Sequence, residues 1–224
     1  MKTNEFLSYN NKLVELINYP IDINFFTPKI SAVKKFSIIF IGSVCEKKGV
    51  RQLIQSFPIV KEKFPDATLE IYGRDWFYPK GKSYIELLQD MEIPKLGNIN
   101  KDIHFHGVVN YETIPEVYAQ AQVCVFPSHM ETQGLVSLEA MAMEKLVIFT
   151  NQGPGLETII HQENGLLCNP FSPEDIADKI CWVFSNEEKV KKMESRARTF
   201  VLEKFSSEAI VKKNLDFYKS LLKN

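Results

Sequence analysis

The chain has 224 residues, of which 45% are hydrophobic and 25% charged, which is enough for the core of one large domain or two small ones. The formal net charge of −1 argues against nucleic acid as a main partner, because nucleic acid favours a basic surface. The N-terminus lacks a signal peptide's apolar stretch, and no apolar run approaches the roughly 20 residues that span a bilayer. We expect a soluble cytoplasmic protein, with peripheral association at the inner face of the membrane left open.

The four cysteines are Cys45, Cys124, Cys168 and Cys181. None forms a C-x-x-C pair, and their spacing is too sparse for a small disulfide scaffold. Three of them lie in apolar runs typical of strands or helices. The pattern therefore indicates reduced thiols in the core.

Residues 1–34 are mixed, and we expect a short helix, one strand-like piece and a connector there. The regular pattern starts with a buried strand at 36–42 that ends in a glycine. In the following segment, apolar residues recur at i, i+3, i+4 and i+7 from Val50, which predicts an amphipathic helix. Pro58 either kinks this helix or opens a second short turn.

Strands and helices then alternate along the chain. Strands are expected at 67–73, 102–107, 122–128, 145–150 and 164–169, helices at 83–91, 111–121, 134–143 and 153–160, and only helices at 172–184, 186–205 and 206–224. This alternation predicts a Rossmann-like α/β fold with a doubly wound parallel sheet of about six strands, followed by C-terminal helices. Such sheets bind ligands at the carboxyl ends of their strands, which here lead into loops 42–49, 73–83, 107–111, 127–134 and 150–155.

Two carboxylates surround the start of the helix expected at 134–143. In that helix, Leu135 and Leu138 share one apolar face, and Glu139 lies at its edge. An unpaired buried carboxylate is costly or changes its pKa. Together with Glu131, Glu139 can accept hydrogen bonds from a pair of diols. The alternatives are a favourable charge near a helix N-terminus for Glu131, and a structural hydrogen bond or ion pair for Glu139.

The same helix start can hold an anion. Gly134 allows close approach of a ligand to the backbone, and the N–H groups of Gln133, Gly134 and Leu135 would point at the anion. The first loop, "GSVCEKKG", also precedes a helix and offers Lys47 or Lys48 as a cation. The alternative for this loop is an ordinary polar turn.

The histidines do not form a metal site by their spacing. His104 and His106 alternate on one expected strand and share a face, but no third ligand follows at metal-binding spacing. No D-x-D pair is present to hold a divalent ion against a diphosphate.

The run "VCVFPSHMETQGLVSLEAMA" resembles the retaining GT-B glycosyltransferases, specifically the C-terminal donor-binding domain of the family 4-like (group 1) enzymes. It contains their E-x7-E signature, from Glu131 to Glu139. The segments "IGSVCEKKGV", "HFHGVV" and "ENGLLCNP", and the glycine loop before Glu157, resemble the same group in the same order. The resemblance covers about residues 17–222.

The resemblance implies a reaction. Such enzymes transfer a sugar from a nucleotide-diphosphate sugar, linked to UDP, GDP or ADP, to an acceptor hydroxyl with retained configuration. The acceptor would be a glycan or a lipid-linked glycan in polysaccharide biosynthesis. No cofactor and no metal are implied, because helix amides and a lysine would neutralise the diphosphate.

The resemblance also implies site residues. Glu139 would accept hydrogen bonds from the ribose, and Glu131, the catalytic candidate, would lie beside the donor sugar. Lys48 and the amides of Gln133–Leu135 would hold the diphosphate, and the segment from His106 to Val109 would lie near the base.

The donor site would also include Gly42 and Ser43. The family often has Arg where this chain has Ser43, so Arg74 or Arg51 would have to compensate. Elsewhere, Glu144 and Leu146 replace a common Gly and Pro, which we expect to be a structural difference.

The chain is shorter than a two-domain GT-B enzyme. We expect a connector remnant at 1–34, a donor-binding domain at 35–204 and a crossing helix at 205–224. The missing acceptor-binding half would be supplied by an N-terminal domain or a partner subunit, and the chain alone would be incomplete for catalysis. The alternatives are a non-catalytic nucleotide-sugar-binding subunit and a GT-B relative such as an epimerase or phosphorylase.

The last helix carries an apolar face that we expect to be partly exposed and able to self-associate. Its members are Ile210, Leu215, Tyr218 and Leu221 or Leu222.

Overall fold

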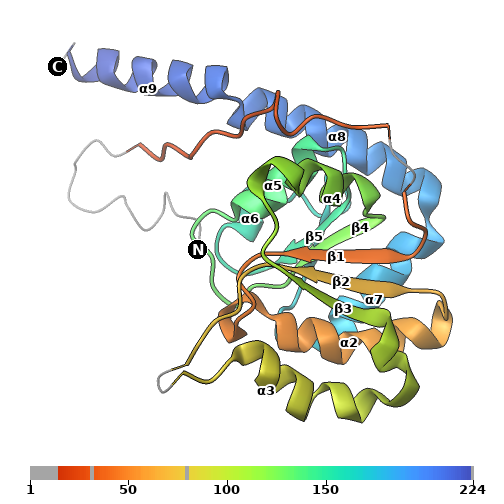
Figure 1. Ribbon diagram of the computed structural model, residues 1–224. Coiled ribbons are helices and arrows are strands. Elements are labelled where there is room, and N and C mark those ends of the chain that lie inside the picture. Colours follow the sequence, from red (N-terminus) through yellow and green to blue (C-terminus); the bar gives the residue numbers. More distant parts are fainter. Residues whose placement is uncertain (1–14, 31–32, 79–80, 223–224) are drawn as a thin grey trace.

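A computed structural model describes residues 15–30, 33–78 and 81–222 (Figure 1). Within these residues, six parallel strands form one sheet in the order β3-β2-β1-β4-β5-β6. The strands are β1 (Ser37–Ile41), β2 (Thr68–Tyr72), β3 (Ile103–Gly107), β4 (Val123–Phe126), β5 (Val147–Thr150) and β6 (Leu166–Cys168). The Rossmann-like doubly wound fold expected from the sequence is confirmed.

Helices cover both faces of the sheet (Figure 1). Helices α2 and α7 pack together on one face, and α5 and α8 pack together on the other. The helices are η2 (Glu46–Lys48), α2 (Val50–Lys63), α3 (Tyr84–Met91), η3 (Ile93–Asp102), η4 (Tyr111–Thr113), α4 (Ile114–Gln120), α5 (Leu135–Ala142), α6 (Gly155–Thr158), α7 (Pro173–Ser185), α8 (Glu187–Phe205) and α9 (Ser207–Leu221).

The central strands are mostly apolar because both faces of the sheet are covered. All residues of β1, β4 and β5 are buried, and they form the middle of a single large core. The four cysteines are buried free thiols, as the sequence indicates.

The structure decides between the two alternatives left open at Pro58, and it adds one segment that the sequence did not predict. Helix α2 continues through Pro58 to Lys63, so a second turn does not open there. Pro58 removes one helical N–H, but the buried side chains of Phe57 and Val60 hold both halves of the helix to the core. The 3₁₀ segment η3 was not expected at all, and Gly97 interrupts it with a φ of 56°.

The N-terminal segment is described only from residue 15, so a helix expected before that lies outside the described residues. The strand-like piece is a single parallel bridge between Ile21 and Ser206. It joins the segment to the junction of α8 and α9. The division into connector, donor-binding domain and crossing helix stays a prediction.

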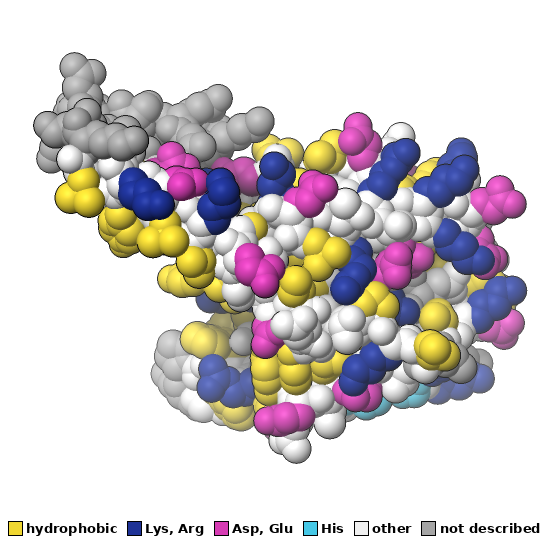
Figure 2. All heavy atoms as spheres, turned by 90° about the horizontal axis from the view of Figure 1, so that it is seen from above, with side chains coloured by type: hydrophobic (Ala, Val, Ile, Leu, Met, Phe, Trp, Pro, Cys, Tyr) yellow, Lys and Arg dark blue, Asp and Glu magenta, His cyan; other side chains and the backbone are white. Residues whose placement is uncertain are grey.

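Helix α9 projects from the body of the molecule (Figure 1). Hydrophobic side chains gather along the projecting part at the left of Figure 2. Exposed members are Val211, Leu215, Tyr218, Leu221 and Leu222. The expectation was wrong for Ile210, which is buried against the end of α8. No helix among the described residues is long and apolar enough to cross a membrane.

Candidate functional site

The loops after β1 and β4 pack directly against each other at the carboxyl edge of the sheet. Gly49, between η2 and α2, has a φ of 70°, and a Cβ there would lie 1.9 Å from the carbonyl oxygen of Pro127. A side chain at position 49 would therefore push the two loops apart. In addition, the N–H of His129 donates to the carbonyl of Lys47 at 2.8 Å. The first loop and the loop before α5 thus form one surface.

An ion pair spans these two loops. Lys48 Nζ donates to Glu131 Oε1, and Ser128 Oγ donates to the same oxygen at 3.1 Å. The side chain of Glu131 is only 8% exposed, whereas that of Lys48 is 22% exposed. The cation expected at the diphosphate and the carboxylate expected beside the donor sugar are therefore direct neighbours.

The backbone at the start of α5 packs closely against strand β5. Gly134 has a φ of 73°, and a Cβ there would lie 2.4 Å from the ring of Phe149. The side chain of Gln133 is turned away, because it exchanges hydrogen bonds of 2.7 and 2.9 Å with the backbone of Tyr19. Only backbone N–H groups of the first turn remain to meet an anion, since these have no partner within the helix.

Glu139 lies one turn into α5 and is held by a buried tyrosine. The hydroxyl of Tyr118, on α4, donates to Glu139 Oε2 at 3.0 Å. Burial raises the pKa of Glu139, and this hydrogen bond partly opposes the rise. Among the described residues, Tyr118 supplies the only hydrogen bond to the carboxylate. The structural hydrogen bond foreseen for Glu139 exists, and Oε1 is left to accept from a ligand.

The His106 ring lies against side chains of the neighbouring strand β2. Its ring stacks on Tyr72 with centroids 4.3 Å apart, and its Nε2 lies 2.7 Å from Glu70 Oε2. Gly107, with a φ of 70°, then turns the chain into an exposed segment that contains Val108 and Val109. The His106 side chain is 37% exposed, so both its ring and the exposed Val108 are accessible to a ligand near this turn.

The basic residues near Ser43 have different surroundings. Arg51 is paired with Glu46 in η2 and with Glu92 between α3 and η3, at 3.0 Å each, so its guanidinium already has two carboxylate partners. Arg74 lies beside the first loop, because its carbonyl accepts from the N–H of Val44 at 2.9 Å. No ion pair of Arg74 is present among the described residues, so Arg74 remains the candidate. Gly42, which ends β1, donates to the carbonyl of Tyr72 at 3.0 Å.

The sequence did not single out Tyr118 or Ser128. A tyrosine inside an apolar helical run is a usable signal, because a buried tyrosine hydroxyl needs a partner. The partner of Tyr118 lies on another helix, whereas the partner of Ser128 is Glu131, three residues away in the same loop. Nothing in the local pattern around Tyr118 points to Glu139.

No group of three or more His, Cys, Asp or Glu residues in the described part of the chain is arranged to hold a metal ion. Around the start of α5 the structure places the charged side chains of Lys48, Glu131 and Glu139.

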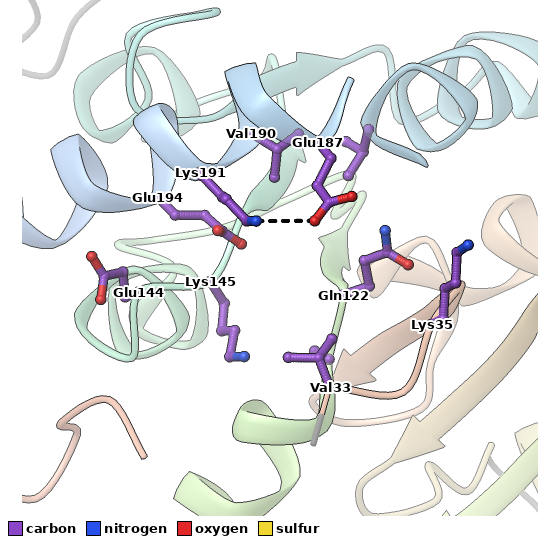
Figure 3. Close-up of a pocket in the computed structure, with 11 residues that line it drawn as sticks. Val33, Lys35, Gln122, Glu144, Lys145, Glu187, Val190, Lys191 and Glu194 are labelled. Atoms are coloured by element: carbon purple, nitrogen blue, oxygen red, sulfur yellow. Dashed lines mark ion pairs between the residues drawn. The ribbon is translucent and has the colours of Figure 1, made fainter. Parts of the chain in front are cut away.

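A cavity of about 390 Å³ lies at the opposite end of the sheet (Figure 3). Its lining includes Lys35, Gln122 and Lys145, which precede β1, β4 and β5, and Lys191, which pairs with Glu187 at 3.0 Å. At the carboxyl edge there is a smaller cavity of about 180 Å³ between the first loop and Trp76. We place the functional site at the carboxyl edge despite this difference in volume, because parallel α/β sheets bind ligands there.

The six-stranded parallel sheet and its flanking helices match the fold found in GT-B glycosyltransferase structures. Residues 23–200 match the family described as glycosyl transferases group 1, and the chain belongs to that family.

The chain is also similar in sequence to glycosyltransferase relatives, and in fold to solved structures. The chain is 32% identical over 182 residues to an uncharacterised glycosyltransferase of Methanocaldococcus jannaschii, covering 81% of this chain and 44% of that protein. It is 29% identical to the capsular polysaccharide biosynthesis glycosyltransferase CapM of Staphylococcus aureus, covering 84% of this chain and 47% of CapM. HepE of Anabaena, solved in complex with UDP, has the same fold, with a TM-score of 0.81 at 22% identity over 94% of this chain and 57% of HepE. The chain thus spans about half the length of these proteins.

Proposed function

We propose that this chain is the donor-binding half of a retaining glycosyltransferase. It binds a nucleotide-diphosphate sugar at the carboxyl edge of the sheet, for transfer of the sugar to an acceptor hydroxyl in glycan or polysaccharide biosynthesis. The observation that carries this proposal is that an ion pair, Lys48–Glu131, precedes the start of α5, and a second held carboxylate, Glu139 bonded by Tyr118, lies one turn into the same helix.

The diphosphate lies at the first-turn amides of α5 and beside Lys48. The amide dipoles and the lysine both favour negative charge there. Charge develops on the leaving nucleotide diphosphate as the bond to the sugar breaks, and these fixed groups stabilise it. Because they supply positive charge, the proposed mechanism has no metal.

The ribose lies at Glu139. Its hydroxyls donate to the carboxylate oxygen that Tyr118 leaves open. The base then lies along the turn from His106 to Val109, where the exposed chain can meet it. Support for a uridine nucleotide comes from HepE, which has this fold and was solved with UDP.

The donor sugar lies at Glu131. This carboxylate is buried and already accepts hydrogen bonds from Lys48 and Ser128, so its position is fixed before a donor arrives. We assign Glu131 as the catalytic candidate, which orients the sugar beside the diphosphate. CapM is named for capsular polysaccharide biosynthesis, which supports a glycan or lipid-linked glycan as the acceptor.

The acceptor is held by a further domain or partner subunit. The cavity of about 180 Å³ beside the first loop is small, whereas transfer needs the acceptor held against the donor in a closed cleft. A non-catalytic nucleotide-sugar-binding subunit is the second candidate, and the same observation favours it. The two are distinguished by assaying sugar transfer with and without an acceptor-binding half.

A thermal-shift screen with UDP-, GDP- and ADP-linked sugars tests donor binding. A ligand that binds only the folded state stabilises it by about 2.7 kcal/mol at a concentration 100 times its Kd. We expect one nucleotide class to raise the melting temperature of the wild type, with a smaller rise for Glu139→Gln. Equal rises in both proteins would contradict a ribose site at Glu139.

A further inference from the structure

We infer that Tyr118 is the positioning residue for Glu139, and that its hydroxyl enables this carboxylate to select a ribonucleotide over a nucleotide without ribose hydroxyls. The inference rests on the proposed function, since it assigns a role to Tyr118 in the same site. Tyr118 itself is fully buried and does not touch the ligand.

The Tyr118 hydroxyl has two acceptors within reach, and Glu139 is the stronger one. Its hydroxyl lies 3.0 Å from Glu139 Oε2 and 3.2 Å from the carbonyl oxygen of Val136. A hydroxyl has a single proton to donate. The carboxylate is nearer and charged, and hydrogen bonds to charged acceptors are the stronger ones, so the proton goes to Glu139.

The Tyr118 ring is packed tightly enough to keep its hydroxyl directed at Glu139. The ring is enclosed between α4 and the core and meets Phe26 edge to face, with centroids 6.2 Å apart. A long glutamate side chain can adopt several rotamers, but the bond to a fixed hydroxyl restricts it to one. Oε2 therefore faces Tyr118, and Oε1 is directed away to accept from a ligand.

The same bond affects the charge of Glu139. Burial raises the pKa of this carboxyl, and the Tyr118 hydrogen bond favours its ionised form. The other titratable groups near the pair are Tyr111, which feels the charge of Glu139, and Cys124, which is near Tyr118. Asp22 acts on Tyr111. None of them donates a hydrogen bond to Glu139 in the described residues, so Tyr118 is the group that keeps Glu139 an acceptor.

The experiment compares Tyr118→Phe with Tyr84→Phe. Tyr84 is a matched control, because it is equally buried and its hydroxyl donates to another carboxylate, Glu46, at 2.7 Å. The affinity of each protein is measured by calorimetry for UDP and for 2′,3′-dideoxy-UDP, with the GDP and ADP pairs run in parallel. The ratio of the two affinities isolates the ribose hydroxyls.

We expect wild type and Tyr84→Phe to prefer the ribonucleotide by the same factor. In Tyr118→Phe this preference should fall roughly tenfold, the effect of losing one hydrogen bond to a charged group. The loss of UDP affinity on acidification should also begin at a higher pH in Tyr118→Phe, because its Glu139 takes up a proton more readily. A purely structural role would lower the melting temperature and leave both the ratio and the pH profile unchanged.

Two outcomes overturn the inference. If the wild type binds a ribonucleotide and Tyr118→Phe keeps the preference, Tyr118 does not act through Glu139, while the proposed function stands. If the wild type binds none of the three nucleotides, the proposed function fails and the inference with it. Should Tyr118→Phe not fold, incorporation of 3-fluorotyrosine into otherwise native protein makes the hydroxyl a stronger donor. The pH below which UDP affinity is lost should then move to a lower value. An unchanged pH dependence would overturn the inference.

Discussion

Lys48 and Glu131 form an ion pair between the loop after β1 and the loop before α5. Both groups are expected to touch the donor, Lys48 at the diphosphate and Glu131 at the sugar. An incoming diphosphate must therefore compete with Glu131 for the lysine. The ion pair also holds the two loops together in the absence of a ligand.

The ion pair predicts opposite effects of Glu131→Gln on two measurements. The amide keeps the shape but removes the charge that competes for Lys48, so affinity for a free nucleoside diphosphate should rise a few-fold. Sugar transfer in the presence of an acceptor-binding half should fall. Calorimetry and a transfer assay measure the two effects, with Glu144→Gln, at the opposite end of the sheet, as the control. A loss of diphosphate affinity in Glu131→Gln would contradict the competition.

Glu139→Gln should raise the stability of the fold and weaken nucleotide binding. Burial raises the pKa of Glu139 in the folded state, so its favourable contribution to stability exists at low pH and is lost as the pH rises through the folded pKa. At neutral pH the ionised, buried carboxylate thus destabilises the fold, and the uncharged Gln removes this cost. We expect a higher melting temperature at pH 7, together with nucleotide binding weaker by about 1.5–3 kcal/mol. A variant that melts lower at neutral pH and binds normally would show that Glu139 is structural.

Glu70 predicts the reverse dependence on pH. Burial alone would raise its pKa, but hydrogen bonds from Lys34 and His106 outweigh burial and hold the pKa below the usual range. Its contribution to stability is therefore present above the unfolded pKa and is lost as the pH falls through the folded pKa. Glu70→Gln should cost about 1–3 kcal/mol at pH 7, because a buried charged hydrogen-bonded group loses its partners. Urea denaturation should show this difference shrinking at pH 4, and a cost that is constant with pH would contradict it.

Chelation should leave nucleotide binding unchanged. The proposed diphosphate site uses Lys48 and the α5 amides for positive charge, with no ion between them. Titration of UDP with and without EDTA should give the same Kd. If binding disappears with EDTA and returns with Mg²⁺, an ion supplies the charge assigned to these groups.

The sequence predicts the alternation of strands and helices because the central strands are short, mostly apolar runs, glycines follow or end the first three strands at Gly42, Gly73 and Gly107, and the helices keep a 3.6-residue period. It could not predict that α2 passes through Pro58, since that depends on how firmly Phe57 and Val60 are held by the core. The 3₁₀ segment η3 has neither period, so no local signal marks it.

For the candidate site, the edge position of Glu139 already indicated a carboxylate that needs a partner. The identity of that partner required the packing of α4 against α5, which brings Tyr118 to it over 21 positions of sequence. Arg51 shows the opposite case. The resemblance suggested Arg51 or Arg74 as a substitute for the arginine missing at Ser43, but the ion pairs of Arg51 with Glu46 and Glu92 depend on tertiary packing that the local pattern does not show.

The central claim is that a nucleotide diphosphate binds across the start of α5. It is tested most directly by calorimetric titration of UDP, GDP and ADP into the wild type, Lys48→Met and Lys191→Met. Lys191 is the control, because it lines the larger cavity at the opposite end of the sheet. We predict that Lys48→Met loses at least about tenfold in affinity, equivalent to about 1.4 kcal/mol, and that Lys191→Met binds as the wild type does. Normal binding by Lys48→Met together with lost binding by Lys191→Met would contradict the account and move the site to the other cavity.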